Sequence, residues 1–212
     1  MAILEFPPHI DADEEGLLAI GGDLEVDSLL LAYKNGIFPW PLGKKNLLAW
    51  FSPPFRTIIE PATFKSHKAL KKLLKDPEIS ITHDKAFEQV IAECASIKRP
   101  KATGTWISQE IINGYNAFFE AGFGFSTEVW RKEKLIAGVY GVHIGRYFAG
   151  ESMFHNEDNC SKFALHSLLA RITLEGGTFL DCQVMNPFLE TLGAFEVSRE
   201  EFLERLKGHV ET

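Results

Sequence analysis

Apolar side chains recur at helical spacing along much of this chain, and polar or turn-forming residues separate these stretches. Phe87, Val90, Ile91 and Cys94 keep the three- and four-residue steps of one helix face, and Asp84 stands where we expect the capping side chain. Capping residues, glycines and prolines mark the ends of further predicted helices. These cover residues 27–35, 64–75, 109–121, 161–175, 187–192 and 199–207, the last one capped by Ser198.

Runs rich in β-branched and aromatic residues predict strands. Residues 123–130, 135–144 and 147–154 are joined by short turns, which indicates an antiparallel meander. Shorter strands are expected at 56–59, 79–82 and 178–184, and the first part of the chain is turn-rich because glycine and proline are frequent there. A meander followed by a helix, a strand and a helix is an α+β arrangement, and its order resembles the acyltransferase fold of the N-acetyltransferase superfamily.

The length of the chain allows one large domain or two small ones, since it has 212 residues. A loop at residues 97–104 that contains Lys, Arg and Pro marks the boundary that we expect between two layers. We therefore predict a small N-terminal α/β layer over residues 1–96 and an acyltransferase-like domain over residues 97–212.

Composition narrows the class of protein. No apolar run approaches the roughly 20 residues of a membrane span, and the N-terminus lacks the basic and apolar regions of a signal peptide. The three cysteines, Cys94, Cys160 and Cys182, are widely scattered, which is typical of reduced thiols in a cytosolic protein. No Cys/His spacing resembles a zinc site. No heptad seam is present, so a monomer is the default expectation.

The charges are unevenly distributed. The net charge of −7 predicts a surface that repels nucleic acid on average, and residues 5–27 carry eight acids with no Lys or Arg. Residues 65–75, by contrast, carry five lysines and no acid: Lys65, Lys68, Lys71, Lys72 and Lys75. A lysine run is usually a solvated helix face, but in an acidic protein this concentration of positive charge favours a contact with a polyanion.

Two short blocks carry the candidate chemistry, namely residues 150–154 (Gly-Glu-Ser-Met-Phe) and 181–183 (Asp-Cys-Gln). In a strand over 178–184, Asp181 and Gln183 would point to one face and Cys182 to the other. A buried carboxylate is costly unless it is paired. The block therefore indicates either a site or a satisfied polar pair at the end of a strand, and the spacing alone does not decide between them.

Coenzyme A is disfavoured as the acyl donor. Acetyltransferases of this fold hold its pyrophosphate on a Gly-rich turn at the start of the helix after the meander. Here the corresponding turn, residues 155–162, has no glycine and contains Glu157 and Asp158, which would repel a pyrophosphate.

Read together, the motifs resemble those of the leucyl/phenylalanyl-tRNA–protein transferase family over most of the chain. The most specific are Gly-Ile-Phe-Pro-Trp, Gly-Glu-Ser-Met-Phe and Asp-Cys-Gln, in that order. The matching segments are residues 6–8, 16–24, 32–40, 50–53, 104–107, 128–130, 138–141, 150–154, 161–162, 181–183 and 192–194, with Arg56. Departures from the family pattern occur at Phe51, Cys160, Asn186 and Phe188, and Phe188 bears most on specificity.

The resemblance implies a cytoplasmic enzyme that uses no metal and no small cofactor. It implies that Leu, Phe or Met moves from a charged tRNA to the N-terminal Lys or Arg of an acceptor protein, which marks that protein for degradation. An α-amine titrates near pH 8, so roughly a tenth is nucleophilic at neutral pH. Holding the amine against the activated ester is worth up to ~7–11 kcal/mol, so we expect few catalytic residues.

We assign roles to these residues as hypotheses. Gln183 hydrogen-bonds the amine or the carbonyl, Asp181 accepts from the incoming amine, and Glu151 holds the acceptor's basic side chain or lines the donor pocket. By resemblance, the donor's side chain lies among Val139, Met153, Leu168 and Leu180. Trp50 and Trp106 are the candidates for stacking on the terminal adenine, with Trp40 and Trp130 in the core. The lysine helix of the N-terminal layer contacts tRNA phosphates.

Three other functions remain open. A related aminoacyl-tRNA-dependent transferase that builds cell-wall peptide bridges usually carries two copies of the acyltransferase fold. A coenzyme A acetyltransferase is disfavoured by the acidic turn. A non-catalytic tRNA-binding adaptor would need the lysines and the tryptophans, but it would not need Asp181, Gln183 and Glu151 together.

Overall fold

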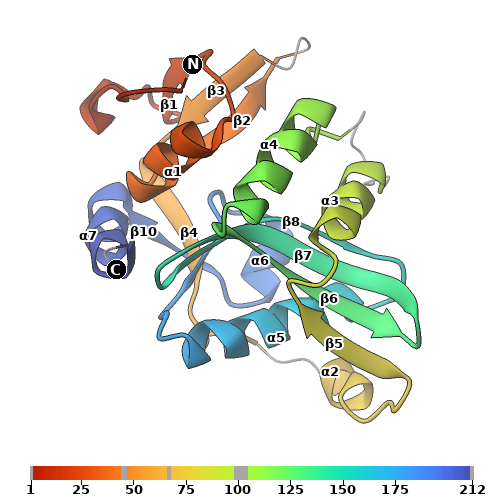
Figure 1. Ribbon diagram of the computed structural model, residues 1–212. Helices are drawn as coiled ribbons and strands as arrows, with labels where there is room; N and C mark the ends of the chain where they lie inside the picture. The colour runs from red at the N-terminus through yellow and green to blue at the C-terminus, as the bar shows by residue number, and fades with distance from the viewer. Residues whose placement is uncertain (1, 44–46, 66–67, 98–104, 211–212) are drawn as a thin grey trace.

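A computed structural model describes residues 2–43, 47–65, 68–97 and 105–210, apart from the side chains of residues 68 and 69. In this part of the chain the strands form a three-stranded sheet of order β1-β3-β2 and a seven-stranded sheet of order β10-β4-β9-β8-β7-β6-β5 (Figure 1). The expected α+β acyltransferase-like architecture is confirmed, with the antiparallel meander at the centre of the larger sheet.

The small sheet was missed by the sequence analysis. Its strands are β1 (Leu17–Ile20), β2 (Phe38–Leu42) and β3 (Leu47–Phe51), all antiparallel. β2 contains Pro39 and Pro41, which argued against a strand. β2 lies at the edge of the sheet, however. Proline has no N–H to donate, and on an edge strand the missing N–H is harmless where that side of the strand has no neighbour. Helix α1 (Val26–Lys34) connects β1 to β2.

The large sheet contains the predicted meander almost residue for residue. Its three strands are β6 (Gly124–Arg131), β7 (Lys134–Ile144) and β8 (Tyr147–His155). β5 (Ile79–His83) extends it beyond β6, and β9 (Leu180–Asp181), β4 (Phe55–Ile59) and β10 (Phe195–Ser198) extend it beyond β8. The strand expected over residues 178–184 is reduced to the two residues of β9, and this shortening shapes the site.

Helices cover both faces of this sheet. On one face lie α3 (Phe87–Ser96) and α4 (Gln109–Glu120), while α5 (Cys160–Leu174) crosses the other face, beside the short helix α2 (Lys68–Leu73) (Figure 1). The short helix α6 (Pro187–Thr191) follows β9, and α7 (Arg199–Val210) packs on β10, β4 and β8. The sheet separates two apolar cores, called here the α4-side core and the α5-side core.

Two predicted helix starts differ from the structure. α2 is described over Lys68–Leu73, and Phe64 and Lys65 of the expected helix 64–75 are not helical, while residues 66–67 lie outside the described part of the chain. Asp84 does not cap α3. It has a positive φ of 57° and accepts a hydrogen bond from the backbone N–H of Ser126 instead. The buried carboxylate of Glu128, on β6, faces the start of α3 and accepts from the N–H groups of Lys85 and Ala86, so the cap comes from another element. Ser198 caps α7 as expected.

The sheets also bear on the domain division. The boundary expected at residues 97–104 falls mostly on residues outside the described part of the chain. β4 and β5 precede that boundary, yet they are strands of the large sheet, and β5 pairs along its length with β6. A division that followed the sheets would fall between Phe51 and Phe55. The division at residue 97 remains a prediction.

Candidate active site

The site lies where two parallel strands separate. β8 and β9 pair only at Phe148–Leu180 and Ala149–Asp181, and β9 then ends while β8 continues to His155. A cavity of about 790 Å³ occupies the opening beyond the last pair. Its walls come from the small sheet, from β8, from the segment after β9 and from helices α5 and α6, with Trp106 added.

A bulge in β8 directs Glu151 away from the course of a regular strand. Tyr140 faces Ser152 and Gly141 faces Gly150, so Glu151 is the extra residue of the pair. Gly141 permits this close pairing, because a Cβ there would lie 1.9 Å from the carbonyl oxygen of Ala149. The bulge turns Glu151 toward the α4-side core and still leaves it in the wall of the cavity.

Glu151 has three hydrogen-bonding neighbours. Its Oε1 lies 2.7 Å from the hydroxyl oxygen of Tyr33 and accepts from Nε2 of Gln183 at 3.3 Å, and its Oε2 lies 3.0 Å from the hydroxyl oxygen of Tyr115. Burial raises the pKa of Glu151 to about 7, although the hydrogen bonds from the two tyrosines act in the opposite direction. The pKa values of Tyr33 and Tyr115 are raised well above the usual range, first by burial and then by the charge of Glu151.

Asp181 does not reach the cavity, and the expectation that it contacts the incoming amine is wrong for this structure. Its side chain is fully buried and forms a two-pronged ion pair with Arg56, at 2.8 Å from Nε and 2.7 Å from Nη2. It also accepts from the hydroxyl of Tyr147 at 2.5 Å and from the backbone N–H of Gln183 at 2.9 Å. Burial alone would lower the pKa of Arg56, but the Asp181 carboxylate raises it well above the usual range.

Gln183 reaches the cavity because the strand has already ended. Its φ of 57° is in the left-handed region, which is uncommon for a residue with a long side chain. The expectation that Asp181 and Gln183 share one strand face is therefore wrong, and Cys182 also lines the cavity. The backbone of Gln183 is held at both ends, since its N–H donates to Asp181 and its carbonyl accepts from the N–H of Thr57 at 3.0 Å.

The apolar part of the cavity matches most of the expected donor pocket. Val139, Met153 and Leu180 line it, whereas Leu168 is fully buried in the α5-side core and does not. Leu165, one helical turn earlier on α5, lines the cavity instead. The rest of the apolar wall comes from the segment after β9 and from α6, namely Val184, Met185, Phe188 and Leu189.

The tryptophans are arranged differently from the expectation. Trp50 is 1% exposed, packs edge-on against Phe6 and donates its indole N–H to the carbonyl of Gly21, so it belongs to the core and cannot stack on a ligand. Trp40, which we expected in the core, is 43% exposed and lines the cavity. It stacks on Trp106, which also lines the cavity, with ring centroids 4.8 Å apart.

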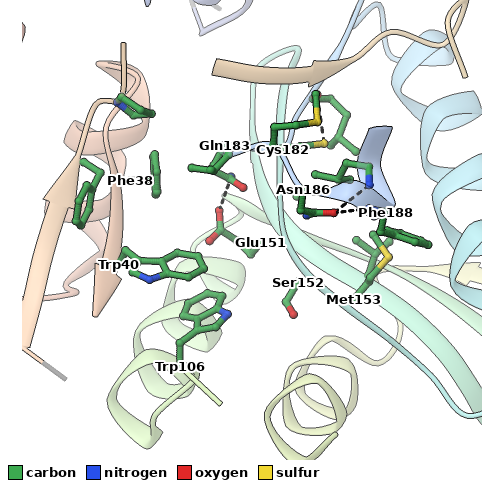
Figure 2. Close-up of a pocket in the computed structure, with 18 of the residues that line it drawn as sticks. Phe38, Trp40, Trp106, Glu151, Ser152, Met153, Cys182, Gln183, Asn186 and Phe188 are labelled. Carbon is green, nitrogen blue, oxygen red and sulfur yellow. Dashed lines mark hydrogen bonds between the residues drawn. The ribbon is translucent and has the colours of Figure 1, made fainter. Parts of the chain in front are cut away.

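Figure 2 shows how these groups are arranged. The hydrogen-bonded pair of Glu151 and Gln183 lies between the Trp40–Trp106 stack and the side of the cavity that carries Met153 and Phe188. The only carboxyl side chains among the lining residues that the structure describes are Glu151 and the exposed Glu15, and no Lys or Arg is among them. A polar centre therefore separates an aromatic end from an apolar end, in a wall that carries no cation.

The predicted lysines lie elsewhere. Lys65, Lys71, Lys72 and Lys75 are exposed and none of them lines the cavity, and the side chain of Lys68 lies outside the described part of the chain. No group of metal-ligating side chains occurs within residues 2–43, 47–65, 68–97 and 105–210. Among the helices of the same residues, none has the length and apolar character needed to span a membrane.

The sequence analysis missed four residues that shape the site. Tyr33 and Tyr115 are far apart in the sequence and are on helices that looked like ordinary core elements. Arg56 was noted only as part of the family pattern, although a buried Asp needs a cation and the strand 56–59 was predicted. Glu15 was noted only as part of an acidic stretch.

Comparisons with known proteins identify the family and the fold. Residues 58–207 match the family model for leucyl/phenylalanyl-tRNA protein transferase, and residues 22–54 match the model for the N-terminal domain of the same family. The leucyl/phenylalanyl-tRNA–protein transferase of Flavobacterium johnsoniae is 44% identical over 97% of this chain and 96% of its own. That of Thermodesulfovibrio yellowstonii is 45% identical over 98% and 84%. The crystal structure of FemX shares the fold, with a TM-score of 0.52 at 11% identity over 81% of this chain and 66% of its own.

Proposed function

The chain belongs to the leucyl/phenylalanyl-tRNA protein transferase family and moves an aminoacyl group from tRNA to protein, and we propose that the cavity between β8 and β9 holds both substrates of this reaction. The observation that carries the proposal is the position of the Glu151–Gln183 pair between an aromatic surface and an apolar recess. Peptide-bridge synthesis, coenzyme A chemistry and a non-catalytic adaptor role are not supported by the family match.

We propose that the donor binds along this axis. Its Leu, Phe or Met side chain enters the recess formed by Val139, Met153, Leu165 and Leu180. Selectivity among the three should be modest, since one methylene is worth only ~1–3 kcal/mol in an apolar pocket. The terminal adenine stacks on the exposed face of Trp40 or Trp106, a contact worth ~1–3 kcal/mol that does not depend on which base is present. This arrangement would place the ester near Gln183.

The reaction needs little proton transfer from the protein. The neutral α-amine attacks the ester carbonyl, the C–N bond forms as the bond to the 3′-oxygen breaks, and the proton lost by nitrogen ends on that oxygen. Because Nε2 of Gln183 donates to Glu151, its Oε1 remains available to accept an N–H from the attacking amine. Asp181 acts as a positioning residue, since it holds the backbone N–H of Gln183 in the left-handed turn.

We propose that the acceptor approaches over the acidic rim of the cavity. Acceptors that begin with Lys or Arg bring a positive side chain, and the exposed carboxylate of Glu15 is the charged group of the wall best placed to attract it. Transfer to such proteins marks them for degradation in this proposal. The tRNA phosphates are bound by the lysines of residues 65–75, namely Lys65, Lys68, Lys71, Lys72 and Lys75.

The catalytic part of the proposal is tested by transfer from labelled leucyl-tRNA to a peptide that begins with Arg. We expect Gln183→Ala to lower the transfer rate at saturating tRNA by at least tenfold while the affinity for tRNA stays within about threefold. Gln89→Ala, on the exposed face of α3, makes the same change away from the cavity and should leave both unchanged. An equal loss of affinity and an intact rate per bound complex would show that Gln183 only binds the donor.

The acceptor part is tested by charge. Glu15→Lys should raise the KM of an Arg-initiated peptide and leave the KM of a peptide that begins with citrulline, the neutral analogue, almost unchanged. Glu14→Lys is the matched control, because Glu14 is also exposed but does not line the cavity. If the two variants weaken the Arg peptide to the same extent, the effect comes from the general field of the acidic segment and Glu15 has no special role.

A further inference from the structure

Tyr33, Tyr115 and Glu151 form a closed triangle of short contacts. The hydroxyls of Tyr33 and Tyr115 are 2.5 Å apart, and each is also within hydrogen-bond distance of a different oxygen of Glu151. All three side chains come from different elements, α1, α4 and β8, and both tyrosines are almost fully buried. At these oxygen–oxygen distances and this burial, each contact is favourable only if a proton lies between its two oxygens.

Counting protons decides the state of Glu151. Each tyrosine hydroxyl carries one proton, so an ionised Glu151 gives two protons for three contacts. If both hydroxyls donate to the carboxylate, the 2.5 Å contact between Tyr33 and Tyr115 has no proton and brings two oxygen lone pairs together. A protonated Glu151 supplies the third proton. The three donors can then run around the triangle in one direction, and every contact becomes a hydrogen bond.

We propose that Glu151 is a neutral carboxylic acid in the resting enzyme and that Tyr33 and Tyr115 are positioning residues that close a three-proton ring with it. This inference rests on the proposed function only for its consequence, and its test requires no substrate.

The surroundings of Glu151 support the neutral form. Burial raises its pKa to about 7, and the Asp181 carboxylate acts in the same direction, whereas the hydrogen bonds from the two tyrosines and the charge of Arg56 act against it. Arg56 is already engaged by Asp181 in a two-pronged pair. It also donates to the carbonyl of Gly36, so it is not available as a counter-ion for Glu151.

The consequence is that the group formed by Asp181, Arg56, Gln183 and Glu151 carries no net charge. Asp181 is neutralised by Arg56, Gln183 is neutral, and Glu151 would carry its proton. A carboxylate beside the attacking amine would favour the ammonium form and raise the pKa of that amine. Without that charge, more of the amine is deprotonated and reactive. A neutral Glu151 also does not form an ion pair with the positive side chain of the acceptor, so Glu15 is left as the group that attracts it.

The carbonyl-stretch band of a protonated carboxylic acid tests the proposal by infrared difference spectroscopy of the full-length enzyme. At mildly acidic pH, the wild-type spectrum minus that of Glu151→Gln should contain one such band, and the band should disappear as the pH rises past neutrality. Glu151→Gln keeps the size and hydrogen-bonding capacity of the side chain, so it should fold, and circular dichroism checks that it does. Absence of the band at mildly acidic pH would mean an ionised Glu151 and would overturn the proposal.

The tyrosines are tested by the frequency of the same band. Tyr33→Phe and Tyr115→Phe each remove one hydrogen bond from the acid, so each should move the band to higher frequency. Tyr140→Phe is the matched control, since it removes the hydroxyl of another buried tyrosine, one that packs edge-on against Tyr115. A band that stays in place in both Tyr33→Phe and Tyr115→Phe would refute the ring. Because no tRNA is needed, this outcome is independent of the transfer assay.

Discussion

Replacing Asp181 by Asn separates a positioning role from direct catalysis. Asp181 is fully buried and accepts four hydrogen bonds, two of them from Arg56. The substitution keeps the shape of the side chain but removes its charge, which leaves the buried Arg56 without a counter-ion. Breaking a buried ion pair on one side costs about 3–5 kcal/mol. For a chain of this size that cost corresponds to a fall in melting temperature of roughly 10 °C.

The measurement is urea unfolding of Asp181→Asn together with leucyl transfer and tRNA affinity. We expect a lower free energy of unfolding, tRNA affinity close to wild type, and slower transfer, because the uncharged amide oxygen of Asn accepts the backbone N–H of Gln183 more weakly than the carboxylate does. Asp76→Asn is the matched control. Asp76 pairs with Arg131 at a solvent-exposed position, where an ion pair contributes little to stability.

The double variant Arg56→Met, Asp181→Leu sharpens this test. Replacing both partners of a buried pair by apolar residues is often neutral or stabilising, so the double variant should recover most of the stability lost in Asp181→Asn. It should not recover transfer, since Leu cannot hold the N–H of Gln183. If Asp181→Asn were as stable as the wild type and yet slow, the carboxylate would be acting on the substrate and the positioning role would be wrong.

Three further predictions follow from the same geometry. Trp106→Ala and Trp40→Ala should each weaken binding of leucyl-tRNA or of its terminal aminoacyl-adenosine by ~1–3 kcal/mol, measured by titration. Replacing Lys71 and Lys72 together by Gln should reduce the slope of log affinity for tRNA against log salt by about one to two units, and an unchanged slope would remove the lysines from the interface. The free energy of unfolding of Glu151→Gln, relative to wild type, should rise by about 3 kcal/mol between pH 4.5 and pH 7 and then stay level. The unfolded carboxyl titrates near 4.5 and the folded one near 7, so the wild type loses stability over that range and the variant does not.

Much of the fold could be predicted because long elements have strong patterns. The meander and helices α3, α4 and α5 each bury a regular set of apolar positions, and for the meander, α4 and α5 the predicted limits are within a few residues of the observed ones. The small sheet had no comparable pattern. Its strands are four or five residues long, and β2 alternates proline with aromatic residues, so local rules indicated a series of turns.

The tryptophans show how the missed sheet affected the site. Trp50 is opposite Pro39 across β2 and β3, and Trp40 is opposite Ala49, so the two tryptophans point to opposite faces of the small sheet. One face packs on the core and the other faces the cavity. Residue type alone gives both tryptophans the same expected burial. The pairing register of β2 and β3, which the sequence did not reveal, decides which of them lies in the core and which lines the cavity.

The polar centre of the site, Glu151 and Gln183, depends on two departures from regular strand geometry. The alternation of side chains along a regular strand therefore could not predict the positions of both residues. Glu151 contacts the tyrosines of the α4-side core, whereas Met153, two residues later, packs on the α5-side core. In an unbroken strand residues 151 and 153 would share a face. The bulge at Glu151 separates them, and the left-handed turn at Gln183 brings a side chain from the end of β9 to the same point. The carboxyl, the amide and the apolar recess therefore meet only because each strand stops being regular at the place where the substrates must fit.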